Sequence, residues 1–310
     1  MKNERGFALV LTLLVTALLV ALTAEFVDEV YVDSSARANF VDGQQASLLA
    51  ASGIEGAKKL IQMRLIQQYS SQADLDLLSK VLSIDDENGS IRVRAEEESG
   101  KLNINALVTS DGNPNTIFHP IAERLFKKLA LAPQLVDALA DWISSSDVAS
   151  ANGAKTPYYQ ALKPPYAAKG APMDTFEELR LVKGFDGATV ERLRPYLTVY
   201  PNMAGLPTSI NVNTAAKELL ASLDDAMTDE LAQEIIDRRK ITPFVTPTDL
   251  GNKITGMSVL AQELGRNFRI PQQMKGSIFR IISQAKVKDT IRIVEAVVNS
   301  SGKNLYWREY

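Results

Sequence analysis

The sequence predicts an α/β chain of the α+β kind, in which a long N-terminal helix packs on a small antiparallel sheet that a large all-α insertion interrupts. An uncharged run over 7–24 continues without proline as far as Pro114. Strand-like alternation occurs near Val93 and again in the C-terminal segment 273–310, and helix-like periodicity fills the stretch between. Because the strands at both ends must pair to cover the apolar face of the helix, we predict that the helical stretch is an insertion.

The composition excludes several classes of function. A net charge of −3 gives no general attraction to nucleic acid or anionic lipid. The chain has no Cys and one His, which excludes disulfides, thiol nucleophiles, thiolate metal sites and Cys–His catalysis. The phosphate-binding motifs G-x-x-x-x-G-K-[ST] and G-x-G-x-x-G are absent from the sequence. We therefore predict that the protein is not an enzyme, and that His119 is a loop residue before a helix.

The N-terminal apolar segment is long enough to cross a bilayer as a helix, and we place the membrane span at about 7–27. Lys2 and Arg5 precede it and acidic residues follow it, which predicts a cytoplasmic N-terminus and a head on the opposite side. A secretory signal peptide has its small residues after the apolar run, where it is cut. Here the small residue, Gly6, comes before the run.

The helix is expected to continue as a stalk through segment 7–68, on the order of 90 Å in length. Apolar residues at spacings of three and four form one face of an amphipathic helix: Ile54, Ala57, Ile61 and Leu65. Three glycines interrupt the stalk: Gly43, Gly53 and Gly56. Since glycine is costly inside a helix, we expect these positions to permit bending or close packing.

Segments 69–112 and 273–310 are predicted to form the α/β head. Ile91, Val93 and Ala95 alternate as in a half-buried strand. Two further strands, "SIFRIISQAKV" and "TIRIVEAVVNS", flank a turn at Lys288–Asp289, and "NLYWREY" supplies a last edge strand. We expect this hairpin to pair with the early strand near Arg92.

Two helical bundles of the SAM-like or helix-hairpin-helix-like kind are predicted, at 113–206 and 207–272. The expected helices run over 120–131, along an apolar face from Val136 to Ile143, and over 229–240. Thr175 is expected to cap a helix that Gly184 terminates. Asn213 and Thr214 are expected to cap the helix of "TAAKELLASL".

The leader "KNERGFALV" resembles that of type IV pilins and pseudopilins. The resemblance implies a leader peptide of residues 1–6. It also implies a prepilin peptidase that cuts between Gly6 and Phe7, methylates the new N-terminus at Phe7, and leaves the apolar run in place. Most of these proteins carry a glutamate where this chain has Leu11. Lack of that acid resembles the K-type minor pseudopilins of type II secretion systems, which lie at the filament tip.

Four later segments resemble the same K-type family in the same order. They are "SGKLNIN" from Ser99, "ALADWISSSD", "PYYQALKPPYAAKGAPMDTFEELRLVKGFD" and "INVNTAAKELLASL". The resemblance implies assembly with I-type and J-type minor pseudopilins and with the inner-membrane secretion platform. It implies a single-pass protein of the bacterial inner membrane with a periplasmic head, which starts a pseudopilus for protein export.

Calcium is the only cofactor that the resemblance raises, because some K-type members bind it in the helical insertion. The candidate ligands here are Asp141, Asp147 and Glu178. Calcium requires several hard oxygen ligands. Lys155 and Thr156 stand where the family often has acids, so the site is expected to be incomplete.

A membrane-anchored DNA receptor with a helix-hairpin-helix module is the main alternative. The stretch from "INVNTAAKELL" to "ITPFVTPTDL" is similar to such modules. Their turn presents backbone amides to phosphate through glycine, but "LDDAMTDE" has no glycine and four acids. From Pro207 to Pro271 there are seven Lys and Arg against nine Asp and Glu, 7 − 9 = −2, whereas a DNA binder should be basic.

A generic single-pass anchor that carries a scaffold head is the third alternative. Such a protein does not need a glycine immediately before its apolar segment. Processing at Gly6 therefore separates this alternative from the pseudopilin interpretation.

Overall fold

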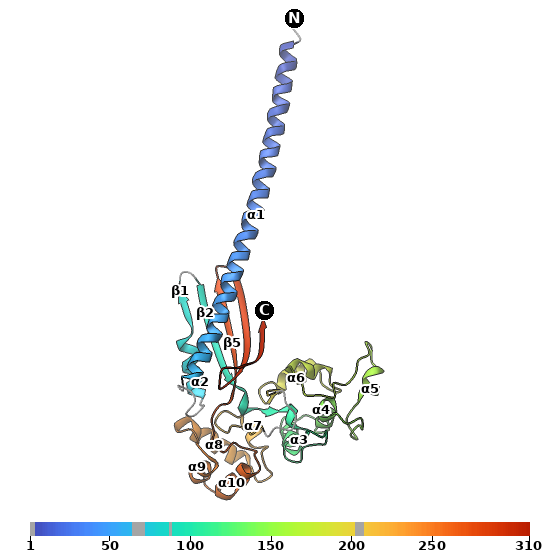
Figure 1. Ribbon diagram of the computed structural model, residues 1–310, viewed down its shortest axis with the longest axis vertical. Coiled ribbons are helices and arrows are strands. Elements are labelled where there is room, and N and C mark those ends of the chain that lie inside the picture. The colour runs from blue at the N-terminus through green and yellow to red at the C-terminus, as the bar shows by residue number, and fades with distance from the viewer. Residues whose placement is uncertain (1–3, 64–71, 87–88, 202–207) are drawn as a thin grey trace.

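The computed structural model describes residues 4–63, 72–86, 89–201 and 208–310, and it shows a rod that ends in a head (Figure 1). The rod is helix α1 (Glu4–Gln62), whose 59 residues give a length of about 90 Å. The helix ends at Gln62, and the predicted continuation through Leu65 to residue 68 lies outside the described residues. The apolar N-terminal part of the rod extends well away from the head (Figure 1).

A five-stranded antiparallel sheet lies against the lower part of the rod. Its order is β1-β2-β5-β6-β7. The strands are β1 (Ile84–Asp86), β2 (Gly89–Glu97), β5 (Ile278–Val287), β6 (Thr290–Asn299) and β7 (Asn304–Glu309). Arg92 in β2 is opposite Gln284 in β5, and the β5–β6 turn contains Lys288 at φ +50°. The predicted hairpin, its pairing with the early strand and the edge strand at the C-terminus are all confirmed.

The rod contacts the sheet through a line of mostly small residues. This contact stripe comprises Gly43, Ala46, Ala50, Gly53 and Ala57. Ile54 and Ile61 are fully buried beside it and pack with Phe279 and Ile281 of β5. Small side chains bring the helix backbone close to the strands, and the larger ones fill the space at either side.

Helix α2 (Gln72–Val81), which the sequence analysis did not predict, covers part of the same core. It buries Leu75 and Leu78 against the stalk–sheet core. The spacing of these two leucines is the signal that would have indicated an amphipathic helix. The sheet therefore packs against two helices, and the rod is anchored on one side of the head.

A second core fills the helical part of the molecule, and its buried residues run from Leu102 to Met274. Short elements connect it to the sheet: η1 (Glu98–Gly100), β3 (Leu102–Asn103), η2 (Ile104–Ala106) and β4 (Leu197–Thr198), with β3 and β4 parallel. The helices are α3 (Phe118–Lys128), α4 (Leu135–Ile143), α5 (Thr156–Gln160), η3 (Phe176–Leu181), α6 (Gly187–Leu193), α7 (Lys217–Leu220), α8 (Asp229–Ile241), α9 (Pro247–Lys253) and α10 (Ser258–Arg266). They lie beyond the end of the sheet that is far from the N-terminus (Figure 1).

Three details of the helical prediction are wrong. Helix α3 begins at Phe118 and ends at Lys128, so His119 lies in its first turn and not in a loop. Helix α7 begins only after Ala216, so neither Asn213 nor Thr214 caps it. The segment after Thr175 is a 3-10 helix, although the predicted cap is present.

Two buried asparagines organise the helical core in the same way. Asn105 donates to the carbonyls of Met173 (3.0 Å) and Val199 (2.8 Å) and accepts from the Met173 N–H (2.7 Å). Asn213 donates to the carbonyls of Phe244 (2.8 Å) and Met274 (3.3 Å) and accepts from the Phe244 N–H (2.8 Å). Each amide therefore ties its own segment to two distant ones. Because these hydrogen bonds occupy its side chain, Asn213 is not available as a helix cap.

Candidate assembly surface

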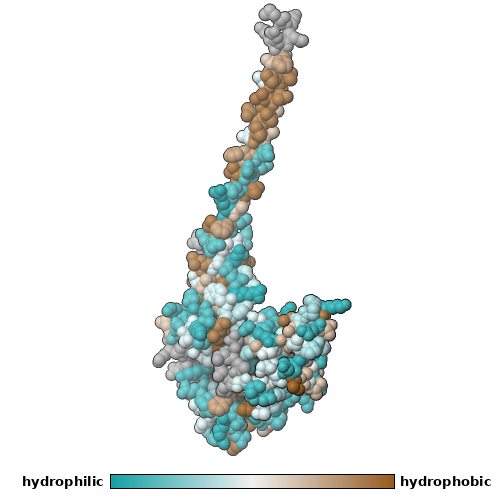
Figure 2. All heavy atoms as spheres, turned by 45° about the vertical axis from the view of Figure 1, so that its right-hand side comes forward, coloured by the Kyte–Doolittle hydropathy of each residue, from teal (hydrophilic) through white to brown (hydrophobic). Residues whose placement is uncertain are grey.

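The N-terminal part of α1 is apolar on all sides and has no cover in the structure (Figure 2). Phe7 is 72% exposed and Leu11 is 52% exposed. By length and composition this is a helix that can cross a membrane. An apolar surface of this size marks a membrane or a protein interface, so α1 is built to be covered from outside the chain.

Of the predicted processing residues, Phe7 and Leu11 lie on this uncovered helix. Gly6 lies in the helix just before Phe7. The run from Phe7 to Ala24 carries no charge, so Leu11 has no carboxylate near it within the segment. Residues 7–24 of α1 therefore present only apolar and hydroxyl side chains to whatever covers them.

Where the sheet covers it, the stalk has two different faces. One face is the contact stripe, buried against the sheet. The opposite face is open, and Leu48 on it is 70% exposed. Nearer the N-terminus, above the sheet, Tyr31 and Phe40 are exposed on opposite sides of the helix. An ion pair between Asp33 and Arg37 (2.8 Å) is also exposed. Since the sheet covers only one side, the face that carries Leu48 is free to contact another helix.

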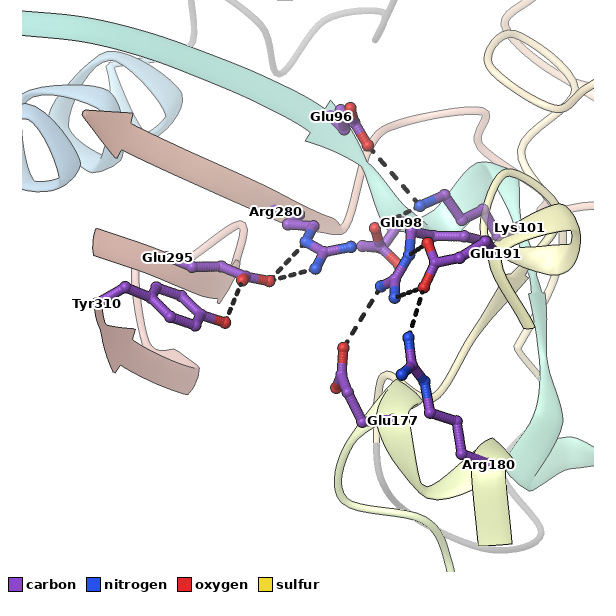
Figure 3. A network of polar contacts seen from close by, with 10 residues as sticks. Glu96, Glu98, Lys101, Glu177, Arg180, Glu191, Arg280, Glu295 and Tyr310 are labelled. Atoms are coloured by element: carbon purple, nitrogen blue, oxygen red, sulfur yellow. Dashed lines mark hydrogen bonds and ion pairs between the residues drawn. The ribbon is translucent and has the colours of Figure 1, made fainter. Parts of the chain in front are cut away.

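A network of charged groups lies where the sheet meets the first helical insertion (Figure 3). Lys101 forms a 2.6 Å ion pair with Glu98, and both side chains are almost completely buried. Lys101 also lies 3.9 Å from Glu96 of β2. Buried charges are tolerated only when they are paired, so this pair fixes the chain direction as it leaves the sheet.

Arg280 and Glu295 extend the network across two strands. The Arg280 Nε donates to Glu295 at 2.7 Å, and the Tyr310 hydroxyl donates to the same carboxylate at 3.2 Å. Burial alone would lower the pKa of Arg280, but the carboxylates of Glu295 and Glu98 outweigh it and raise that pKa. Burial of the Tyr310 hydroxyl, with the nearby Glu295 charge, raises the pKa of Tyr310 to about 12.

Arg194 connects the helical side of the network. Its guanidinium donates twice to Glu191 (2.9 and 3.0 Å) and lies 3.5 Å from Glu177. It also lies over the Phe176 ring, 4.8 Å from the centroid. These hydrogen bonds and the Arg194 charge lower the pKa of Glu191 to about 2. The Arg194 pairs lie within the helical insertion, and the Lys101 and Arg280 pairs lie within the head. A hydrogen bond crosses between the two parts, from the Asn211 side-chain amide to Glu97 at 2.9 Å.

The structure separates the three candidate calcium ligands. Asp141 is 4% exposed and accepts from the Ser150 N–H (2.9 Å) and hydroxyl (2.8 Å). Asp147 is exposed on the same loop. Glu178 instead accepts from the Thr175 N–H (3.0 Å) and pairs with Lys169 (2.9 Å). Within the described part of the chain, no group of three or more His, Asp and Glu side chains could hold a metal ion.

His119 is involved in helix packing. Its Nε2 lies 3.5 Å from Asp137 of α4, and its Nδ1 lies 3.7 Å from Glu123 of α3. No Ser hydroxyl is bonded to it among the contacts of the described residues. The arrangement joins two helices and does not form a nucleophile–base pair.

The acidic turn of the second insertion faces the first insertion. Asp225 pairs with Arg124 (3.4 Å) and Asp229 with Lys128 (2.8 Å), both on α3. The Arg124 Nε also donates to the Ser222 carbonyl at 2.8 Å. A DNA-binding hairpin needs free backbone amides and a basic surface at this turn. Here the turn is acidic and contacts its own chain.

Comparison with known proteins agrees with this architecture. Two family models, both described as Type II secretion system (T2SS), protein K, match residues 100–202 and 210–265, together 159 of the 310 residues. Type II secretion system protein K of Pseudomonas aeruginosa is 25% identical over 304 residues, covering 94% of this chain and 88% of that protein. The protein K of Klebsiella pneumoniae is 27% identical over 260 residues, covering 77% and 76%.

A solved structure has the same fold. A chain in the crystal structure of the GspK-GspI-GspJ complex from the enterotoxigenic Escherichia coli type 2 secretion system matches with a TM-score of 0.68. The match covers 90% of this chain and 99% of the other, at 16% identity. The long apolar helix on an antiparallel sheet, with an interrupting helical insertion, is the α+β fold of a pseudopilin.

Within that class, the matches identify one family. The chain belongs to the type II secretion system protein K family and is a K-type minor pseudopilin. The predicted family and fold are confirmed, and the DNA-receptor alternative is not supported. The family is a structural component of a secretion system, in keeping with the expectation of a non-enzymatic role.

Proposed function

We propose that this chain occupies the tip of the type II secretion pseudopilus and initiates its assembly, so that folded proteins can be exported across the outer membrane. The observation that carries the proposal is the uncovered apolar helix without a carboxylate at Leu11. A subunit inside a filament needs an acid there to neutralise the amine of the subunit above it. An unpaired carboxylate among apolar helices is costly, so a subunit with nothing above it does better without one.

The width of the head supports the tip position. The helical insertion extends the head sideways and beyond the end of the sheet (Figure 1). A filament of repeating subunits requires each head to stack closely on the next. A head enlarged in this way fits at the end of the filament, where no further head follows.

Processing and location complete the proposal. A prepilin peptidase cuts between Gly6 and Phe7 and methylates Phe7, on the cytoplasmic face of the inner membrane. Lys2 and Arg5 lie before the apolar run, which favours a cytoplasmic N-terminus and a periplasmic head. The retained helix stores the subunit in the membrane until the secretion platform draws it into the filament.

The I-type and J-type minor pseudopilins are the proposed partners at the tip. The solved structure with the same fold is part of a complex named GspK-GspI-GspJ. In this chain the face of the stalk that carries Leu48, opposite the contact stripe, is the surface available for neighbouring helices. Helices in a membrane associate by close packing, and this face continues that contact toward the heads.

Site-specific crosslinking tests the partner surface. The natural chain has no cysteine, so a single introduced cysteine is the only thiol. We expect Leu48→Cys, on the free face, to crosslink to the I-type or J-type subunit in the assembled complex. Ala50→Cys, buried against the chain's own sheet, is the matched control and should give no adduct. Equal labelling of both positions would contradict the assigned face.

Leader removal tests the processing step. We expect Gly6→Val to retain residues 1–6, because the peptidase must accommodate the residue before the cut bond, and a branched side chain blocks it. Mass spectrometry of the intact protein would then show the unprocessed and unmethylated chain, whereas the natural chain begins at methylated Phe7. Ala8→Val, on the other side of the bond, is the control. If Gly6→Val matures normally, the chain is a plain signal anchor.

A further inference from the structure

The loop between α4 and α5 is closed around the side chain of Lys155. Lys155 directly precedes α5 and is only 9% exposed. Its Nζ donates to the carbonyl of Asp141 at 2.7 Å and to the carbonyl of Ser144 at 2.8 Å. These carbonyls lie at the end of α4, where the helix leaves them without partners within the helix. The lysine, at the start of α5, therefore provides hydrogen-bond donors for the carbonyl groups at the end of α4.

The charges of two acidic groups act on the same ammonium. Burial lowers the pKa of Lys155, while the charges of Asp141 and Asp147 act in the opposite direction and favour its charged form. The Asp141 carboxylate is held by Ser150, and the chain at Gly153 passes so close that a Cβ there would lie 1.8 Å from it. A second lysine, Lys183, donates to the carbonyl of Gly153 at 3.0 Å.

Two backbone carbonyls, together with the buried carboxylate of Asp141, are the kind of oxygen donors that a hard divalent cation takes. Calcium is the ion raised by the K-type resemblance for this insertion. A calcium ion would need oxygen ligands at about 2.3–2.6 Å and would have to share the space and the positive charge that Lys155 already supplies. The residues present do not fit the ion.

We propose that the Lys155 ammonium is the resident cation of this loop, in place of a divalent metal ion. The first helical insertion of this chain then orders residues 144–154 without calcium. The proposal concerns only this loop and does not depend on the position of the chain in the filament.

Hydrogen exchange of the full-length chain in detergent, followed by mass spectrometry, tests the proposal. We expect peptides that cover 144–154 to exchange at the same rate, within about twofold, with excess EDTA or with millimolar calcium. We expect Lys155→Met to expose this loop and to speed its exchange at least tenfold, without rescue by calcium, because two buried carbonyls lose their donor. Lys127→Met, on the exposed side of α3, is the control and should leave the loop unchanged.

A charge-reversed variant gives the sharpest outcome. Lys155→Glu adds a carboxylate to the oxygen donors and removes the ammonium, so we expect fast exchange in EDTA and restored protection in calcium. If calcium fails to restore protection in this variant, the loop is not a cation site and the proposal is overturned. The proposal is equally overturned if calcium slows exchange of this loop tenfold in the natural chain, a measurement that remains decisive even if Lys155→Met does not fold.

Discussion

Replacing Gly53 by leucine is expected to detach the stalk from the sheet and to lower the free energy of unfolding of the head by about 3 kcal/mol. A Cβ at Gly53 would lie 2.2 Å from the Ser283 hydroxyl oxygen, 3.1 Å from a Val93 methyl and 3.2 Å from the Ser283 Cβ. A leucine is too large for this gap, and the buried strands on the other side leave it no room to turn away. Denaturant unfolding followed by tryptophan fluorescence would measure the loss.

The neighbouring position provides the control. Ser52 lies on the exposed side of α1, so Ser52→Leu should change stability by less than about 0.5 kcal/mol. The Ser283 hydroxyl is buried and has no hydrogen-bond partner among the described residues. Ser283→Ala should therefore be neutral or stabilising, and it should restore much of the stability lost in Gly53→Ala. If Gly53→Leu is as stable as Ser52→Leu, the close contact between stalk and sheet is contradicted.

Replacing Asn105 by alanine is expected to cost about 4 kcal/mol and to loosen the first helical insertion as a unit. The change removes three hydrogen bonds and leaves the N–H and C=O of Met173 and the C=O of Val199 buried without that partner. Each buried backbone group without a partner costs about 1–3 kcal/mol, and the lost side chain leaves a cavity as well. Chemical unfolding and protease sensitivity of the insertion would both report the change.

An aspartate at the same position separates hydrogen bonding from volume. Asn105→Asp keeps the size of the side chain but cannot donate to the carbonyls of Met173 and Val199, so at neutral pH we expect a loss at least as large as for alanine. Asn152→Ala is the control, because Asn152 is exposed and its side chain donates a surface hydrogen bond to Asp137. Equal stability of Asn105→Asp and the natural chain would show that the amide donors contribute nothing.

Local patterns account for most of the fold that could be predicted. The alternation at Val93 and Ala95, and the turn at Lys288, appear in the structure as predicted, because period-two burial is visible in a short window. The predicted cap at Thr175 is likewise a feature of a few consecutive residues. Helix α2 carried a similar local signal in Leu75 and Leu78 and was nevertheless missed.

The errors occur where distant segments compete for a side chain. Asn213 has the chemistry of a helix cap, but its amide is engaged by Phe244, 31 residues further along the chain. His119 was expected in a loop, but α3 starts earlier because Asn115 accepts from the N–H groups of Ile117 and Phe118. A propensity describes what a residue can do locally, and tertiary contacts decide which option is used.

By itself, the sequence determined that this chain has an apolar helix with a glycine directly before it, and strands at both ends of its head. It also determined that the chain carries the segments typical of a K-type pseudopilin in the same order. These properties can be recognised from the composition, from the spacing of apolar residues and from the order of segments along the chain. Only the tertiary structure decided which face of the stalk is covered, that Asn211 of the insertion donates to Glu97 of the head, and that Lys155 occupies the centre of the α4–α5 loop. Those properties depend on distances between residues far apart in sequence, which no local pattern specifies.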